Sequence, residues 1–183
     1  MDEHAEHLAV ALALAALALG AWLCLQRCAA GPRASRPAPE AGLPVLLQAP
    51  RPALRSLREL RGQAVVLEFW ATWCATCRDA MPRMEKLRAA FRDRPVVFLS
   101  VTAEERAAVE AYLREHPVTG WVGLDPGQAL ARALGATGVP QIFLIDPQGL
   151  VRLQTRPGFF YEADIERALK GARPRADLLA YPP

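Results

Sequence analysis

The sequence predicts a single α/β domain in which a mixed central sheet is covered by helices on both faces. From Leu43 onward, short apolar runs typical of strands alternate with stretches whose apolar residues recur every three or four positions, as in helices. The expected order is strand, helix, strand, helix, helix, strand, strand, helix. The 183 residues suffice for one domain of ordinary size with a short appendage.

The first predicted strand and helix flank a pair of cysteines. The run AVVLEF at residues 64–69 has the composition of a buried central strand. After Cys77, apolar residues recur at helical spacing with basic residues between them: Ala80, Met84, Leu87 and Phe91 against Arg83, Lys86 and Arg88. We therefore expect an amphipathic helix that begins at the cysteines and has Arg88 on its polar side.

The next strand and helix follow directly. The run PVVFLSV at residues 95–101 is apolar and contains several β-branched residues, which favours a strand. Thr102 and Glu105 have the spacing of a capping box, so a helix is expected to begin here and to continue to about Glu115.

A short helix and a hairpin are expected next. Asp125 can cap the short helix, with Pro126 at its first position and Gly135 after its end. The apolar runs at residues 141–145 and 150–155 are separated by the turn sequence DPQG, which predicts a hairpin.

The last predicted element is a helix over residues 162–170, which carries apolar residues on one side and ends at Gly171. Prolines mark residues 174–183 as a loose tail. The expected domain therefore covers residues 43–173.

An uncharged apolar run of 18 residues, 8–25, precedes the domain. At about 1.5 Å of rise per residue, such a helix is close to the shortest that crosses a hydrocarbon core of roughly 30 Å. We expect residues 1–28 to be a membrane anchor; the alternative is a cleaved secretory signal, because small residues follow Cys28. Residues 29–42 are rich in Ala and Pro and are expected to form an extended spacer.

The overall composition argues against a nucleic-acid-binding protein and against a fold held together by disulfides. Lys and Arg total 22 against 19 for Asp and Glu, so the net charge of +3 is small, and a nucleic-acid-binding protein is not expected. The 4 cysteines form two close pairs, Cys24 with Cys28 and Cys74 with Cys77, which cannot staple a whole fold. Cys24 and Cys28 are expected to be small apolar residues near the membrane boundary, with a second redox pair or a lipid attachment site as alternatives.

Cys74 and Cys77 stand where a strand ends and a helix begins. The free N–H groups and the dipole of a helix N-terminus stabilise a thiolate and lower the pKa of the first cysteine. Cys74 is therefore the expected nucleophile, and Cys77, one turn later, the resolving thiol. A zinc site is the alternative for a lone pair at this spacing, but no second pair lies downstream and none of the 3 histidines is near it in sequence.

Two motifs in the correct order resemble a known family. The first is FWATWCATCR at residues 69–78, followed by Met81 and Pro82, and the second is GVPQIFLID at residues 138–146. They resemble the active-site signature and the cis-proline loop of thioredoxin-like proteins, and they are most similar to the membrane-anchored bacterial branch typified by TlpA and ResA. The resemblance covers roughly residues 43–171. It implies a three-layer thioredoxin-like fold, in which a proline inside the active-site helix is tolerated.

The resemblance also implies a set of site residues. Pro140 would be cis beside the cysteines, and the backbone of Val139 would pair with an extended substrate segment. Trp73 would belong to the docking surface, although a tryptophan at a helix start can equally be core. Glu68 matches a buried acid whose raised pKa suits it to take the proton of the resolving thiol. The alternatives are a trans bond at Pro140 and a water-facing side chain at Glu68.

As a function, the resemblance implies a thiol-disulfide oxidoreductase that reduces disulfides in partner proteins, such as an apocytochrome or a copper-site assembly factor. It would need an upstream thiol-disulfide donor and neither a cofactor nor a metal. The alternative is a thioredoxin-like module for copper delivery or protein binding, with His116 as the available extra ligand. Ala80 occupies a position that is often acidic in this branch, so no acid-base role transfers to it.

The resemblance places the domain outside the cytoplasmic membrane, whereas the charges around the apolar run favour the opposite orientation. Acidic residues precede the run and basic residues follow it: Asp2, Glu3 and Glu6 against Arg27, Arg33 and Arg36. Positive charge tends to stay on the cytoplasmic side. The bias is small, and we therefore expect an extracytoplasmic domain.

Overall fold

The computed structural model describes residues 35–171 of the chain. The strands in this range are β1 (Arg36–Pro37), β2 (Val45–Leu47), β3 (Ala64–Phe69), β4 (Val96–Thr102), β5 (Trp121–Leu124), β6 (Gln141–Ile145) and β7 (Leu150–Thr155). They form one sheet in the order β1-β7-β6-β3-β4-β5-β2. β3, β4 and β5 run parallel, and the remaining pairs are antiparallel. The sheet is therefore mixed, as predicted.

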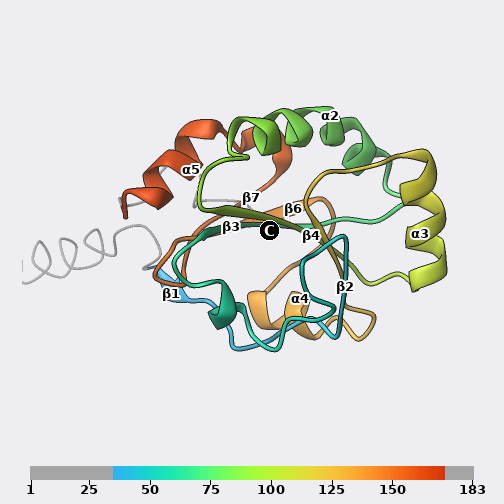
Figure 1. The fold of residues 1–183 in the computed structure, drawn as a ribbon, viewed down its shortest axis with the longest axis horizontal. Helices are drawn as coiled ribbons and strands as arrows, with labels where there is room; N and C mark the ends of the chain where they lie inside the picture. The colour runs from blue at the N-terminus through green and yellow to red at the C-terminus, as the bar shows by residue number, and fades with distance from the viewer. Residues whose placement is uncertain (1–34, 172–183) are drawn as a thin grey trace, which may run out of the picture. The chain divides into compact units, whose positions relative to one another are not determined.

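Helices cover both faces of this sheet. The described helices are η1 (Leu57–Leu60), α2 (Ala75–Ala90), α3 (Arg106–Glu115), α4 (Ala129–Leu134), η2 (Pro157–Phe159) and α5 (Glu162–Leu169). In Figure 1, α2 and α5 lie on one face of the sheet and α4 lies on the other. This confirms the predicted α/β arrangement of three layers.

The alternation of side chains along β3 decides which residues face which layer. Val65 and Leu67 belong to the buried cluster that contains the leucines of α4, whereas Val66 packs with apolar residues of α2 and α5. Successive side chains of a strand point to opposite faces. Glu68 therefore shares the face of Val66 and lies beneath α2.

The predicted start of α3 is wrong. Thr102 is the last residue of β4 rather than a helix cap, and its hydroxyl bonds the carboxylate of Glu104. The helix begins at Arg106, and the preceding Glu105 makes no side-chain capping bond. The strand extends this far because Thr102 pairs with Leu124 of β5, a strand that the sequence analysis did not anticipate.

α4 begins later than predicted. Its first residue is Ala129 rather than Pro126, because Gln128 adopts a left-handed conformation (φ 52°) and interrupts the turn. Asp125 still satisfies the start of the helix from four residues away, since its Oδ1 accepts the N–H of Ala129 at 2.8 Å. Gly135 ends the helix at φ 70°, as predicted.

The sheet extends into the range expected to be a spacer. β1 lies within residues 29–42, and its Arg36 pairs with Val151 of β7. Ala38 and Ala41 pack against the core beneath α4. Residues 35–42 therefore belong to the folded domain, which includes residues that precede Leu43.

The expected membrane anchor at residues 1–28, with Cys24 and Cys28, and the tail at residues 174–183 lie outside the described residues. Within residues 35–171, no helix has the length and apolar character needed to cross a membrane.

Candidate active site

Cys74 and Cys77 meet at the N-terminus of α2. Cys74 is the N-cap residue, and the two sulfurs form a disulfide with a Cα–Cα distance of 5.2 Å. The backbone N–H of Cys77 donates to Cys74 Sγ at 3.1 Å, and Thr76 Oγ1 lies 3.4 Å from the same sulfur. Cys77 is 1% exposed and Cys74 5%. Donors thus converge on the first sulfur, while the second is the more deeply covered.

The loop before Cys74 is held by a carboxylate from another element. Glu104, which follows β4, accepts the backbone N–H of Thr72 at 2.7 Å and its hydroxyl at 2.6 Å. Arg78 of α2 donates to the carbonyl of Thr72 at 2.9 Å. These bonds fix the backbone two residues before the nucleophile. Glu104 was not predicted as a site residue, because a lone glutamate after a strand carries no distinctive sequence pattern.

The two predicted docking residues, Trp73 and Val139, differ in their exposure to solvent. Trp73 is 70% exposed, so the alternative of a core tryptophan is wrong. The Val139–Pro140 bond is cis, as the resemblance implied, and Pro140 is buried. Val139 is partly buried and packs on the cluster that contains both cysteines.

Glu68 is buried at the centre of the sheet. Glu68 is 7% exposed, so the alternative of a water-facing glutamate is wrong. Burial raises the pKa of Glu68 from 4.5 to about 7; Arg88 opposes this rise and Glu85 adds to it. The carboxyl can therefore exchange a proton near neutral pH.

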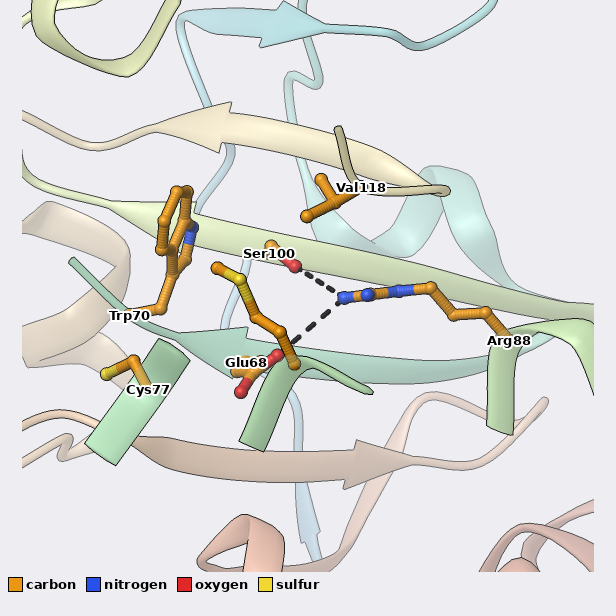
Figure 2. A pocket seen from close by; sticks show the side chains of 7 residues that line it. Glu68, Trp70, Cys77, Arg88, Ser100 and Val118 are labelled. Carbon is orange, nitrogen blue, oxygen red and sulfur yellow. Dashed lines mark hydrogen bonds and ion pairs between the residues drawn. The ribbon is translucent and has the colours of Figure 1, made fainter. Parts of the chain in front are cut away.

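Glu68 and the resolving cysteine are both among the side chains that line one small cavity (Figure 2). It is lined by Glu68, Trp70, Cys77, Met81, Arg88, Ser100 and Val118. The cavity offers about 10 Å³ to the centre of a water molecule, which is close to the smallest space that holds one water. Glu68 and Cys77, nine positions apart in the sequence across the strand-to-helix junction, thus line the same small cavity.

Arg88 is the residue of this site that the sequence analysis placed wrongly. It is 7% exposed and belongs to the buried face of α2, where its NH2 group donates to Ser100 Oγ at 2.8 Å. The sequence did contain a signal for this position. Cys77, Met81, Met84 and Arg88 are separated in turn by four, three and four positions, which places them on one face of the helix. A charged residue at a core-facing position indicates a buried partner, and Glu68 is that partner at 3.7 Å.

His116, the extra ligand considered for copper, stacks on Tyr112 with ring centroids 4.5 Å apart. Within residues 35–171, no group of three or more His, Cys, Asp or Glu side chains is arranged to hold a metal ion. His116 is therefore not gathered with the cysteine pair.

Comparison with known proteins agrees with this geometry. The AhpC/TSA family profile matches residues 35–154. The thiol-disulfide oxidoreductase ResA of Bacillus thuringiensis subsp. konkukian (strain 97-27) is 30% identical over 119 residues, which cover 64% of this chain and 68% of the relative. ResA of Geobacillus kaustophilus (strain HTA426) is 33% identical over 119 residues, with the same 64% and 68% coverage.

Solved structures show the same fold. The crystal structure of a thiol:disulfide interchange protein of the thioredoxin family from Chlorobium tepidum TLS superposes with a TM-score of 0.59 at 29% identity, covering 75% of this chain and 96% of that chain. The sheet order, the cysteine pair at a helix start and these relatives agree. The chain therefore belongs to the AhpC/TSA family of thioredoxin-like proteins, among relatives of the TlpA/ResA type, and is a thiol-disulfide oxidoreductase.

Proposed function

We propose that this oxidoreductase reduces disulfide bonds in partner proteins, with Cys74 as the nucleophile and Cys77 as the resolving thiol. The observation that carries the proposal is the position of Cys74 Sγ, which accepts the N–H of Cys77 at the first turn of α2. Backbone donors and the helix dipole stabilise a thiolate at this sulfur. Cys77 lacks this advantage, because it lies within the helix and is more deeply buried.

The reaction proceeds by two exchanges. The Cys74 thiolate attacks a substrate disulfide, forms a mixed disulfide and releases one substrate sulfur, which takes up a proton. Cys77 then loses its proton and attacks Cys74 Sγ, so that the Cys74–Cys77 bond forms and the second substrate sulfur leaves. The substrate is reduced by two electrons and the cysteine pair is oxidised. An upstream thiol donor must return the pair to its dithiol form.

Glu68 is the proposed acceptor of the Cys77 proton. Its pKa of about 7 makes the carboxylate available at neutral pH while keeping it basic enough to take a thiol proton. The cavity that both residues line has room for about one water, which could bridge them. Trp70 lines the same cavity, and its buried Nε1 has no hydrogen-bond partner within the described residues, so a water there would satisfy it.

The substrate is proposed to dock beside the cysteines as an extended segment. The backbone of Val139, next to the cis bond, would pair with it as an added strand. Trp73 is adjacent to Cys74 and 70% exposed, which gives a partner a large apolar contact. Buried Pro140 would hold this loop against the cysteines.

Covalent trapping tests the proposal. In Cys77→Ala the mixed disulfide on Cys74 cannot be resolved, so partner proteins should remain attached in the native host. The bound proteins should be released by a reducing agent. The matched control is Cys74→Ala, which keeps Cys77 and should trap far less, because Cys77 is 1% exposed. A Cys77→Ala variant that captures no protein through Cys74, or equal capture by both variants, contradicts the proposed roles.

We also propose that residues 8–25 anchor the chain in the membrane and that the catalytic domain lies outside the cytoplasm. The length and uncharged character of the run support the anchor. The basic residues that follow the run argue for the opposite orientation. Reporter fusions after Pro183 test the orientation: activity of a reporter that works only in the cytoplasm would overturn it, and release of the full chain from membranes by alkaline carbonate would overturn the anchor.

A further inference from the structure

Arg88 places a positive charge in the interior of the domain, on the face of α2 that covers the sheet. Its side chain is 7% exposed, and its NH2 group lies 3.7 Å from Glu68 Oε2. Figure 2 shows the guanidinium directed toward both Glu68 and Ser100. A buried cation is costly unless anions lie close to it. The anions that surround Arg88 therefore decide what its charge does.

Glu85 is the second anion. It precedes Arg88 by one helical turn, and its Oε1 accepts from the NH1 group of Arg88 at 2.6 Å. The same carboxylate accepts the backbone N–H of Thr119 at 3.1 Å, in the segment between α3 and β5. The Glu85 side chain is 31% exposed. Glu85 thus connects the interior charge to the protein surface.

The two carboxylates hold the guanidinium unequally. Glu85 is within hydrogen-bond distance of Arg88 at 2.6 Å, whereas Glu68 is at 3.7 Å, beyond it. Because each anion partly neutralises the cation, a strong contact with one weakens the electrostatic effect of Arg88 on the other.

We propose that Glu85 and Arg88 are positioning residues of the redox reaction, and that the competition of two carboxylates for one guanidinium governs proton transfer from Cys77 Sγ to Glu68. In the resolving step, the S–H bond of Cys77 breaks and Glu68 receives the proton. The sulfur then bonds to Cys74 and displaces the substrate sulfur. The proposal rests on the acceptor role of Glu68 proposed above.

Few other groups near Glu68 could shift its pKa. The charged residues that face it both come from α2, Arg88 and Glu85, and the other ionisable group that lines the cavity is Cys77. The remaining neighbours from the packed elements are uncharged: Trp70, Met81, Ser100, Val118 and Ile142. The directions agree with the geometry, because Arg88 lowers the pKa of Glu68 and Glu85 raises it.

Competition predicts shifts of opposite sign. When the charge of Glu85 is removed, Glu68 is the remaining anion beside Arg88. The guanidinium then stabilises the ionised form of Glu68 more strongly, which lowers the pKa of Glu68. Removing the charge of Arg88 raises that pKa, because only burial and repulsion remain. A purely structural role for either residue predicts lower stability without opposed shifts.

The test is a direct titration of Glu68 in the full chain in its dithiol form, by the NMR signals of 13C-labelled glutamate carboxyls. The Glu68 signal is assigned by its loss in Glu68→Gln. Glu85→Gln should lower the midpoint by roughly one pH unit and Arg88→Met should raise it by roughly as much, with Arg88→Lys closer to the wild type. The matched control, Glu110→Gln, removes a carboxylate from the exposed pair with Arg106 and should leave the midpoint unchanged.

A midpoint that does not move in Glu85→Gln, or that moves in the same direction in Glu85→Gln and Arg88→Met, overturns the proposal. If Arg88→Met does not fold, Glu85→Gln decides alone, since its amide oxygen can still accept from Thr119.

The rate at which the Cys74–Cys77 bridge closes separates this proposal from the one on which it rests. An unchanged rate in Glu68→Gln refutes the acceptor role, and with it the control of proton transfer, even where the titration shifts occur. A slowed rate in Glu68→Gln with unmoved midpoints in Glu85→Gln and Arg88→Met refutes the competition alone.

Discussion

A carboxyl that is buried beneath a helix binds its proton more tightly in the folded chain than in the unfolded one. For Glu68 the pKa rises from 4.5 to about 7 on folding. Between these values the folded state binds more protons, so the free energy of unfolding falls as the pH rises, by about 3 kcal/mol in total. We predict that Glu68→Gln abolishes this loss. Urea unfolding of the oxidised protein at pH 5 and pH 8 measures it, and an equal pH effect in both proteins would contradict the prediction.

The same carboxyl should shape the pH dependence of catalysis. As the pH rises through about 7, Glu68 loses its proton and becomes able to accept one from Cys77. We expect the rate of mixed-disulfide resolution to rise over this range, and Glu68→Gln to slow it by about 100-fold at pH 7. Stopped-flow measurement of the second exchange checks this. Formation of the mixed disulfide by Cys74 should be much less affected.

Trp73 should matter for partners and not for folding. With 70% of its surface exposed, its removal takes little from the core, so Trp73→Ala should change the free energy of unfolding by less than about 0.5 kcal/mol. We expect KM for protein disulfides to rise several-fold, because large exposed aromatics contribute strongly to binding. Turnover of a small disulfide should stay the same, and an equal loss with both substrates would contradict a docking role.

At the scale of elements, the loop before the nucleophile depends on a contact with the segment after β4. Glu104→Ala removes the acceptor of the Thr72 N–H and hydroxyl and should destabilise the domain by about 1–3 kcal/mol. Amide hydrogen exchange at Thr72 should accelerate. The matched control is Glu105→Ala, since the exposed Glu105 makes no capping bond with its side chain. Equal effects of the two substitutions would contradict a specific role for Glu104.

The long apolar runs were predictable and the short strands were not. The strands at residues 64–69, 141–145 and 150–155 coincide with β3, β6 and β7, because each has six or five residues of strong β character. β5 was missed since it has four residues, one of them Gly123. A Cβ at this glycine would stand 2.4 Å from Leu43 Cδ1, so a larger residue would force the Leu43 side chain to shift. Local sequence does not reveal such a contact with a residue 80 positions away.

Some residues of the active site were likewise predictable from the sequence, and others were not. The cysteine pair and the cis bond at Pro140 were predictable, because motifs specify them locally. Burial of Glu68 follows from its place in an apolar strand. Arg88 was placed on the polar side of α2, because a basic residue in an amphipathic helix usually faces water. Its helical spacing from Cys77, Met81 and Met84 indicates a core-facing position, but only the packing of α2 over β3 identifies Glu68 as its buried partner.

At the scale of the whole molecule, the folded unit includes residues that precede its first long strand. Ala38 donates to the carbonyl of Gly149 at 2.8 Å, and Ala41 accepts from Leu57 at 3.1 Å. We predict that a chain beginning at Ser35 folds with unchanged stability, whereas one beginning at Leu43 loses about 2 kcal/mol, through lost hydrogen bonds and lost burial of the two alanines. Thermal or urea unfolding of both proteins checks this, and equal stability would contradict the prediction.

The ends of the sheet are short. β1 has two residues, one of them Pro37, which has no N–H to offer, and β2 has three, followed by Gln48 at φ 55°. Long, unprotected edge strands invite chains to add to one another and aggregate. Because β1 and β2 are this short, and one of them contains a proline, these two border strands offer an added chain few free backbone groups of their own.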